Sequence, residues 1–154
     1  MTDAEEGFIK RAIELAEEAV SNGNTPFGSL LEVDGEVVRE ARNRTLTDDD
    51  IAAHPEFVLA RWAASELEAD DRAACTMYTS TEPCPMCAAA IHYAGLGRVV
   101  YSVEGTSLAA LRDGGVITIP CAEVIEQGNG DTVVDGPVLE DEGIAVHESF
   151  YGEE

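Results

Sequence analysis

The order of apolar and polar side chains in the first third of the chain predicts a helix followed by a β-hairpin. Residues 3–20 carry apolar side chains at helical spacing, with glutamates and a lysine on the opposite face. Residues 27–33 and 36–41 have the composition of two strands, and Asp34-Gly35 between them suits a tight hairpin turn. A polar loop from Asn43 to Asp50 follows the hairpin.

The rest of the chain alternates helical and strand patterns. Residues 55–68 are apolar on most sides and predict a buried helix, which Pro55 can begin because the first helical position needs no N–H donor. The further expected elements are a strand at 73–80, a helix at 84–94, a strand at 98–103, a helical turn near 106–112, a short helix after Pro120, a strand near 131–135 and a last helix from Pro137 to Phe150. Strands joined by crossover helices are normally parallel neighbours, so we predict a mixed sheet between layers of helices. No repeat or linker interrupts the pattern, and we expect residues 1–154 to form a single domain.

The charge of the chain is unusual, because 31 acidic residues stand against 9 basic ones and give a net charge of −22. Such a surface repels phosphate backbones and favours a small-molecule substrate over nucleic acid. Such an acidic surface is typical of halophilic proteins. Concentrated salt screens charges to within about 3 Å at 1 M, so the net charge alone does not exclude RNA as a substrate. No apolar run approaches the roughly 20 residues that cross a bilayer, and the acidic N-terminus is unlike a secretory leader, so we expect a cytoplasmic protein with no membrane partner.

Two short motifs bring metal-binding side chains to the starts of predicted helices. They are His54-Pro55-Glu56 and Pro83-Cys84-Pro85-Met86-Cys87. Two cysteines at this spacing can both reach one ion from the first turn of a helix, whose N-terminus favours the thiolate form. Two thiolates and one imidazole leave the fourth position of a zinc ion open for water, whose pKa the metal lowers to about 7. Glu56 could then take up a proton from this water and pass it on, first as a general base and then as a general acid.

Each part of these motifs also has a simpler interpretation. Two cysteines at this spacing occur as a redox pair or as half of a structural zinc site. His54 alone could cap or pack a helix, and Glu56 alone could be a first-turn carboxylate that the helix dipole favours. The combination of His-x-Glu with a later Pro-Cys-x-x-Cys is the signature of zinc-dependent nucleobase deaminases, and it is far more specific than any of its parts.

The resemblance extends beyond the two motifs. Residues 5–112 resemble the cytidine deaminase superfamily and, within it, the branch of guanine deaminases, cytosine deaminases and tRNA adenosine deaminases. The segments that carry the resemblance are Thr25-Pro26-Phe27-Gly28-Ser29, Asn43, Asp50, Ala53-His54, Tyr78 to Ala88, Ala90-Ile91 and Arg98-Val99-Val100-Tyr101. The resemblance implies a cytidine deaminase-like α/β fold, a three-layer α/β/α sandwich with a central mixed five-stranded sheet, and a homodimer.

The resemblance also implies roles for the residues of the two motifs. One zinc ion per chain would be held by His54, Cys84 and Cys87. Glu56 would move the protons while water displaces the amino group of a nucleobase.

Substrate contacts are expected from two parts of the chain. Asn43 lies on the loop that holds the substrate in this branch, where an amide can donate to and accept from the edge of a base. Phe27 and Ala53 would line the pocket around the ring. The C-terminal segment often closes the pocket in this branch, on its own or on a neighbouring subunit, so Phe150 or Tyr151 could stack on the base. The alternative is that Phe150 anchors the last helix to the core.

The sequence departs from the branch at two positions near the pocket. Pro55 stands where most relatives have alanine, and Ile51 where a proline usually follows the aspartate. These departures bear on the identity of the substrate more than on the type of reaction. Guanine, which would be hydrolysed to xanthine and ammonia, is the substrate that the resemblance favours. The alternative substrates are cytosine, a nucleoside or an adenosine of tRNA, and the alternative class is a non-catalytic zinc-binding interaction module. The only local group of basic residues that could bind tRNA is Arg39, Arg42 and Arg44.

Three residues outside the motifs carry expectations about burial. His147 is expected to be partly exposed on the last helix. Cys75 is expected to be an inert core residue, and Cys121 to be structural at the start of a short helix.

Overall fold

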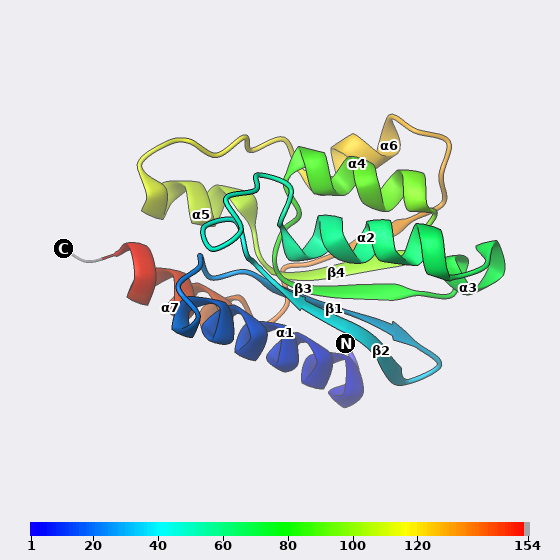
Figure 1. Cartoon of the computed structure of the whole chain (residues 1–154), viewed down its shortest axis with the longest axis horizontal. Helices are drawn as coiled ribbons and strands as arrows, with labels where there is room; N and C mark the ends of the chain where they lie inside the picture. The colour runs from blue at the N-terminus through cyan, green and yellow to red at the C-terminus, as the bar shows by residue number, and fades with distance from the viewer. Residues whose placement is uncertain (153–154) are drawn as a thin grey trace.

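The sheet lies in the middle of the molecule, with the strand order β2-β1-β3-β4-β5 (Figure 1). This computed structural model describes residues 1–152. The strands are β1 (Gly28–Val33), β2 (Glu36–Arg42), β3 (Thr76–Thr81), β4 (Arg98–Val103) and β5 (Val133–Asp135). β1 pairs antiparallel with β2 and β3, whereas β3, β4 and β5 run parallel to one another. The predicted mixed five-stranded sheet is therefore confirmed, with helical crossovers between the parallel strands.

Helices cover both faces of the sheet and complete the three-layer α/β/α arrangement (Figure 1). The helices are α1 (Asp3–Ser21), α2 (Pro55–Glu66), α3 (Ala69–Ala73), α4 (Pro85–Ala94), α5 (Gly105–Arg112), α6 (Cys121–Glu126) and α7 (Glu140–Tyr151). α1 and α7 pack on one face, and α2 and α4 lie side by side on the other, with α6 against α4. Within residues 1–152, no helix combines the length and the apolar character that spanning a bilayer requires.

The N-terminal elements follow their sequence signals closely. α1 begins with a capping box, in which the Glu5 amide donates to Thr2 Oγ1 (3.1 Å) and the Thr2 amide donates to Glu5 Oε1 (2.9 Å). The hairpin turns at Asp34 and Gly35, whose φ angles are 52° and 85°. Positive φ at both positions gives the turn a twist that matches the two strands, as the Asp-Gly pair predicts.

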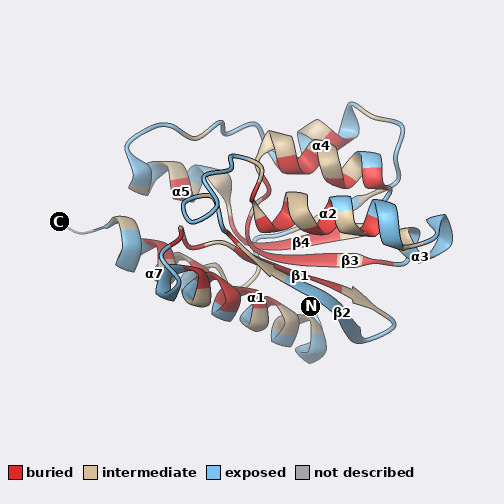
Figure 2. Ribbon diagram, viewed as in Figure 1, coloured by how far each residue is buried: buried red, intermediate tan, exposed pale blue. Residues whose placement is uncertain are grey.

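The central strands are buried on both sides, because neighbouring residues of a strand point to opposite faces of the sheet. Leu31 and Met77 belong to the apolar cluster beneath α2 and α4. Leu30 and Tyr78 belong to a second cluster beneath α1 and α7. Figure 2 shows the buried residues along these strands and on the sheet-facing sides of the helices. The sheet is therefore a rigid platform for the loops at its ends.

Two predicted helix boundaries were wrong. The last helix begins at Glu140 rather than near Pro137, because the Val138 amide donates to the Tyr101 carbonyl (3.0 Å) and Leu139 has a left-handed backbone with φ of 54°. The helix predicted over residues 55–68 ends at Glu66, and α3 was not predicted.

The close packing of α1 on β1 can be tested by substitution of Gly28, a glycine of β1. A Cβ atom on Gly28 would lie 2.5 Å from the Ala16 amide nitrogen and 2.5 Å from the Leu15 Cβ, so Gly28→Ala must push the helix off the sheet. We expect it to lower the free energy of unfolding by about 1–3 kcal/mol, measured by denaturant unfolding of the zinc-loaded protein. The matched control is Gly7→Ala in α1, where nothing lies within 4 Å of the added atom, and which should raise stability by about 0.5–1 kcal/mol. A Gly28→Ala protein as stable as the unchanged protein would contradict this close packing.

Candidate active site

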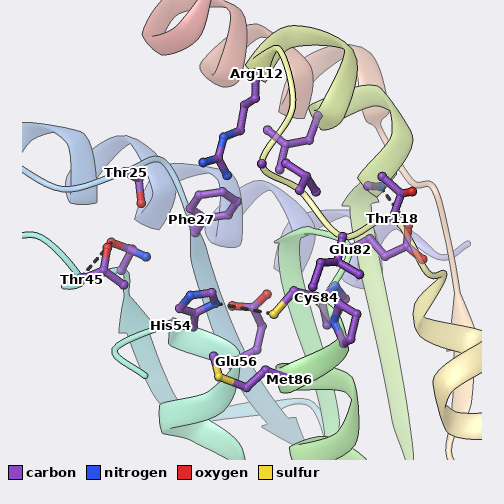
Figure 3. A pocket seen from close by; sticks show the side chains of 18 of the residues that line it. Thr25, Phe27, Thr45, His54, Glu56, Glu82, Cys84, Met86, Arg112 and Thr118 are labelled. Atoms are coloured by element: carbon purple, nitrogen blue, oxygen red, sulfur yellow. Dashed lines mark hydrogen bonds between the residues drawn. The ribbon is translucent and has the colours of Figure 1, made fainter. Parts of the chain in front are cut away.

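The N-termini of α2 and α4 meet on one face of the sheet and bring the motif residues together (Figure 3). His54 is the N-cap of α2, and Cys84 is the N-cap of α4, with Cys87 in its first turn. Both helices begin with a proline, Pro55 and Pro85, which fits the first helical position because no N–H is needed there. Two segments that are distant in the sequence therefore present their donor atoms at the same place.

The three donor atoms have the spacing of metal ligands. His54 Nδ1 lies 3.8 Å from Cys84 Sγ and 3.5 Å from Cys87 Sγ, and the three atoms all lie within 4.8 Å of one another. Tetrahedral zinc with bonds of about 2.1 Å to nitrogen and 2.3 Å to sulfur separates its donors by roughly 3.5–3.8 Å. Hydrogen bonds from the Cys87 thiol and from His54 stabilise the Cys84 thiolate and lower the pKa of Cys84 to about 4, so one thiolate is formed before a metal binds.

Glu56 places a carboxylate beside these donors without joining them. Its side chain is only 4% exposed, and its Oε1 atom has no hydrogen-bond partner among the described residues. Burial, and next the Cys84 thiolate, raise the pKa of Glu56 to about 7, against the opposing charge of His54. An unsatisfied buried carboxylate oxygen is costly unless a ligand or water completes it. Two sulfurs, one imidazole nitrogen and this orphaned oxygen together fit a zinc site with one open position.

The site forms the floor of a cavity of about 510 Å³. The side chains of Phe27 and Leu108 form apolar parts of the cavity wall, and Asn43 contributes a polar amide group. Asn43 Oδ1 accepts hydrogen bonds from the amide (3.1 Å) and the hydroxyl (2.9 Å) of Thr45. Its Nδ2 group makes no hydrogen bond to the described residues and is free to donate to a ligand. A cavity of this size and mixed lining suits a small planar molecule.

The loop that carries Asn43 is held by backbone contacts at both ends. Asn24 Oδ1 accepts from the amides of Leu46 and Thr47, each at 3.1 Å. The Ala53 amide donates to the Asp50 carbonyl (3.1 Å), and the Ala53 carbonyl accepts from the Arg44 amide (3.0 Å). Ala53, which was expected to contact the substrate, is buried beneath the loop and is not part of the cavity lining. Its backbone supports the loop, and its expected contact with the substrate stays a prediction.

The C-terminal aromatic residues point in different directions. Tyr151 lines the cavity, whereas Phe150 is 38% exposed and lines a separate groove between α1 and α7. Successive residues of a helix point about 100° apart, so a helix that turns Tyr151 inward must turn Phe150 away. Phe150 therefore does not line this cavity, and its expected contact with the substrate stays a prediction. Its ring packs edge-on against the Tyr151 ring, with the ring centres 4.8 Å apart, instead of entering the core.

His147 is another correction, because it is 1% exposed rather than partly exposed. Its Nε2 lies 2.7 Å from the Thr81 hydroxyl at the end of β3, and its ring packs 5.2 Å from Phe27 and 6.0 Å from Tyr151. The inward face of α7 therefore supports two residues of the cavity wall. Cys75 and Cys121 are both buried, as expected.

Sequence reasoning missed the far wall of the cavity. This wall comes from α5 and from residues 115–119, which include Arg112 and Thr118 (Figure 3). Glu82 ties it to the end of β3, since its two carboxylate oxygens accept from the amides of Gly105 and Cys121, each at 2.8 Å. Glu82 stands next to the cysteine motif, and that position was the one available signal. Arg112 and Thr118 lie in a segment without any motif.

Comparisons with known proteins agree with this geometry. Residues 2–103 match the family model of the cytidine and deoxycytidylate deaminase zinc-binding region. The chain is 42% identical over 105 residues to guanine deaminase of Bacillus subtilis, covering 68% of this chain and 67% of that protein. It is 28% identical over 156 residues to a probable cytosine deaminase of Schizosaccharomyces pombe, covering 98% and 94%. A structure solved in a study of A-to-I editing by tRNA:A34 deaminases matches with a TM-score of 0.71 and 26% identity, covering 92% of this chain and 99% of that one.

The fold and the site thus define a zinc-dependent hydrolase that removes amino groups from nucleobases. The chain belongs to the cytidine and deoxycytidylate deaminase family. The matched region contains all three donor residues, and the family resemblance seen in the sequence is confirmed.

Removal of one donor tests the metal site. We expect Cys87→Ser to weaken zinc binding by more than about 100-fold, because even supporting partners of a ligand are worth 10–100-fold. The thermal midpoint of the variant should then no longer rise when zinc is added, since metal binding is coupled to folding. Zinc content and competition with a chromophoric chelator measure the first effect. Cys75→Ala, which changes a buried free cysteine outside the site, should bind zinc normally. Full zinc binding by Cys87→Ser would exclude Cys87 as a ligand.

The burial of His147 predicts a pH dependence of stability. Burial, together with the charge of Arg112, lowers the pKa of His147 from 6.5 to about 4. The unfolded chain therefore binds the extra proton first, and the stabilising contribution of the neutral ring is complete above pH 6.5 and is lost as the pH falls toward 4. We expect His147 to account for a loss of about 1.4 kcal/mol between roughly pH 7.5 and 5.5. Urea unfolding of the unchanged protein and of His147→Gln measures it, and equal pH slopes would contradict the prediction.

Proposed function

We propose that this deaminase acts on free guanine, which it hydrolyses to xanthine and ammonia. The observation that carries the proposal is the unsatisfied carboxylate oxygen of Glu56, which is buried beside three metal donors on the floor of a base-sized cavity. A structural zinc site has no use for such a group, because an unpaired buried carboxylate only costs stability. This observation also speaks against a non-catalytic zinc-binding module.

His54, Cys84 and Cys87 would hold the zinc ion. When bound, zinc supplies Lewis acidity that makes a water molecule nucleophilic near neutral pH. Glu56, whose carboxylate lies beside the donor residues in the same cavity (Figure 3), would accept a proton from the attacking water. It would then deliver this proton to the ring nitrogen beside the reacting carbon. Glu56 would next take up the remaining proton of the former water and deliver it to the departing amine. Guanine and water give xanthine and ammonia, so the protons balance and no oxidant is needed.

The cavity walls support a planar base. Phe27 offers an aromatic face that favours contact with a ring, and its position is held by His147 behind it. The free Nδ2 donor of Asn43 suits a ring nitrogen or a carbonyl oxygen of the base. Tyr151 covers part of the cavity and helps to exclude water.

The distribution of positive charge favours a free base over tRNA. Arg42 pairs with Glu18 at 3.1 Å, and Arg44 pairs with Asp48 at 3.0 Å. Arg39 stacks over the Trp62 ring at 5.1 Å. The one local group of arginines is therefore engaged with the protein itself, while phosphate binding depends on available cations. With a net charge of −22, the surface adds no general attraction for RNA.

Guanine is preferred over cytosine on the strength of the 42% identity to guanine deaminase. The match to the probable cytosine deaminase is weaker in identity but spans nearly the whole chain, which makes cytosine the nearest rival. A single domain over residues 1–154, a homodimer, adaptation to salt and a cytoplasmic location stay predictions from the sequence.

Ammonia release tests the proposed reaction. We expect zinc-loaded protein in concentrated potassium chloride to release ammonia from guanine. Glu56→Gln should reduce the rate of release by about 100- to 10,000-fold. Zinc content should not change, because Glu56 is not a ligand. Glu66→Gln, an exposed glutamate at the end of the same helix, is the matched control and should keep full activity.

Each outcome of this assay has a clear meaning. Turnover of guanine that disappears only in Glu56→Gln supports both the substrate and the proton carrier. If the protein deaminates cytosine or an adenosine of tRNA but does not deaminate guanine, that molecule replaces guanine as the proposed substrate. Equal rates for Glu56→Gln and the unchanged protein would remove Glu56 from the reaction.

A further inference from the structure

Arg112 stands at the mouth of the cavity, away from the metal donors. It is the last residue of α5, and Figure 3 shows its side chain directed into the cavity toward Phe27. Its guanidinium lies over the Tyr151 ring, 5.4 Å from the ring centre. This stacking holds the planar group in place and leaves its N–H edge open.

In the part of the chain that the structure describes, Arg112 makes no ion pair and no hydrogen bond. Four other arginines of this acidic protein do have carboxylate partners: Arg11 with Glu40, Arg42 with Glu18, Arg44 with Asp48 and Arg98 with Asp135. The carboxylates in the cavity lining do not satisfy it either. Glu82 is occupied by two backbone amides, and Glu56 lies on the floor. Within residues 1–152, the forked donors of Arg112 thus face the cavity without an acceptor.

The chemistry of guanine provides such an acceptor at the opposite edge from the reacting carbon. Guanine loses its amino group from C2, so C2 must face the metal donors and Glu56. The ring position opposite C2 is C5, and the two acceptors that flank it are O6 and N7. A guanidinium binds this pair of atoms with two parallel hydrogen bonds, the commonest specific contact of arginine with guanine.

We propose that Arg112 is the specificity-determining residue of this deaminase and binds the O6 and N7 atoms of guanine while C2 lies at the metal site. The assignment rests on guanine being the substrate. It explains discrimination against cytosine, which reacts at C4 and has the N1–H donor on the opposite side. Two donors would then face each other with no acceptor between them, and this mismatch lowers affinity. Tyr151 acts with Arg112 by holding the guanidinium in plane.

The test compares guanine with 7-deazaguanine, in which a C–H group replaces the N7 acceptor. In the unchanged protein, kcat/KM for 7-deazaguanine should be about 10- to 100-fold lower than for guanine. In Arg112→Gln, kcat/KM for guanine should fall. The ratio of kcat/KM for guanine to kcat/KM for 7-deazaguanine should shrink by about the same 10- to 100-fold. Comparing ratios removes any difference in the intrinsic reactivity of the two bases.

Two further variants sharpen the test. Arg112→Lys keeps the charge but lacks the forked geometry, so it should lose the discrimination as well. Arg39→Gln removes an arginine that stacks on an aromatic ring outside the cavity, and it should keep the ratio of the unchanged protein. Thermal unfolding of each variant shows whether the fold is kept.

The outcomes separate this inference from the proposed function. Guanine turnover with the same substrate ratio in Arg112→Gln and the unchanged protein would overturn the role of Arg112 alone. If Arg112→Lys discriminates between guanine and 7-deazaguanine as well as the unchanged protein does, the proposed pair of hydrogen bonds is wrong and only the positive charge of Arg112 matters. Absence of guanine turnover in the unchanged protein would overturn the proposed substrate and the role of Arg112 with it.

Discussion

The packing of α2 against α4 is the contact on which the site depends. Each helix begins at the same edge of the sheet, and each supplies ligands only from its N-cap or first turn. The donor atoms of His54, Cys84 and Cys87 can lie within 4.8 Å of one another only while these two N-termini stay side by side. The apolar cluster beneath both helices, which includes Leu59 and Ile91, therefore stabilises the arrangement of the donor residues as well as the fold.

The opposite side of the cavity depends on polar contacts rather than on apolar packing. Glu82 joins the N-termini of α5 and α6 to the end of β3, so the loop between these helices is fixed against the cysteine motif. His147 makes a similar connection from α7, through the hydroxyl of Thr81 and the ring of Phe27. Both side chains act on the cavity from behind. The end of the cavity with the metal donors is thus held by the core, and the opposite wall is held by a few buried or part-buried hydrogen bonds.

Charge is arranged differently inside and outside the cavity. On the surface, carboxylates pair with half of the eight arginines, and the excess of acidic residues leaves a strongly negative exterior. Inside, Glu56 is the one carboxylate without partners among the described residues, and the exposed guanidinium of Arg112 points toward Phe27 from the mouth. An acid at one end and a forked donor at the other match a planar base that loses an amine from one edge and offers acceptors at the opposite edge.

The sequence by itself determined the chemistry of this protein and most of its secondary structure. His54, Glu56, Cys84 and Cys87 could be recognised because their spacing at helix starts is local. The mixed sheet followed from the alternation of strands and helices. The tertiary structure alone decided that Tyr151 enters the cavity while Phe150 turns away, that Ala53 supports a loop, that His147 is buried and that Arg112 lines the cavity. These outcomes depend on the rotation of α7 and on contacts between distant segments, and no pattern of neighbouring residues records them.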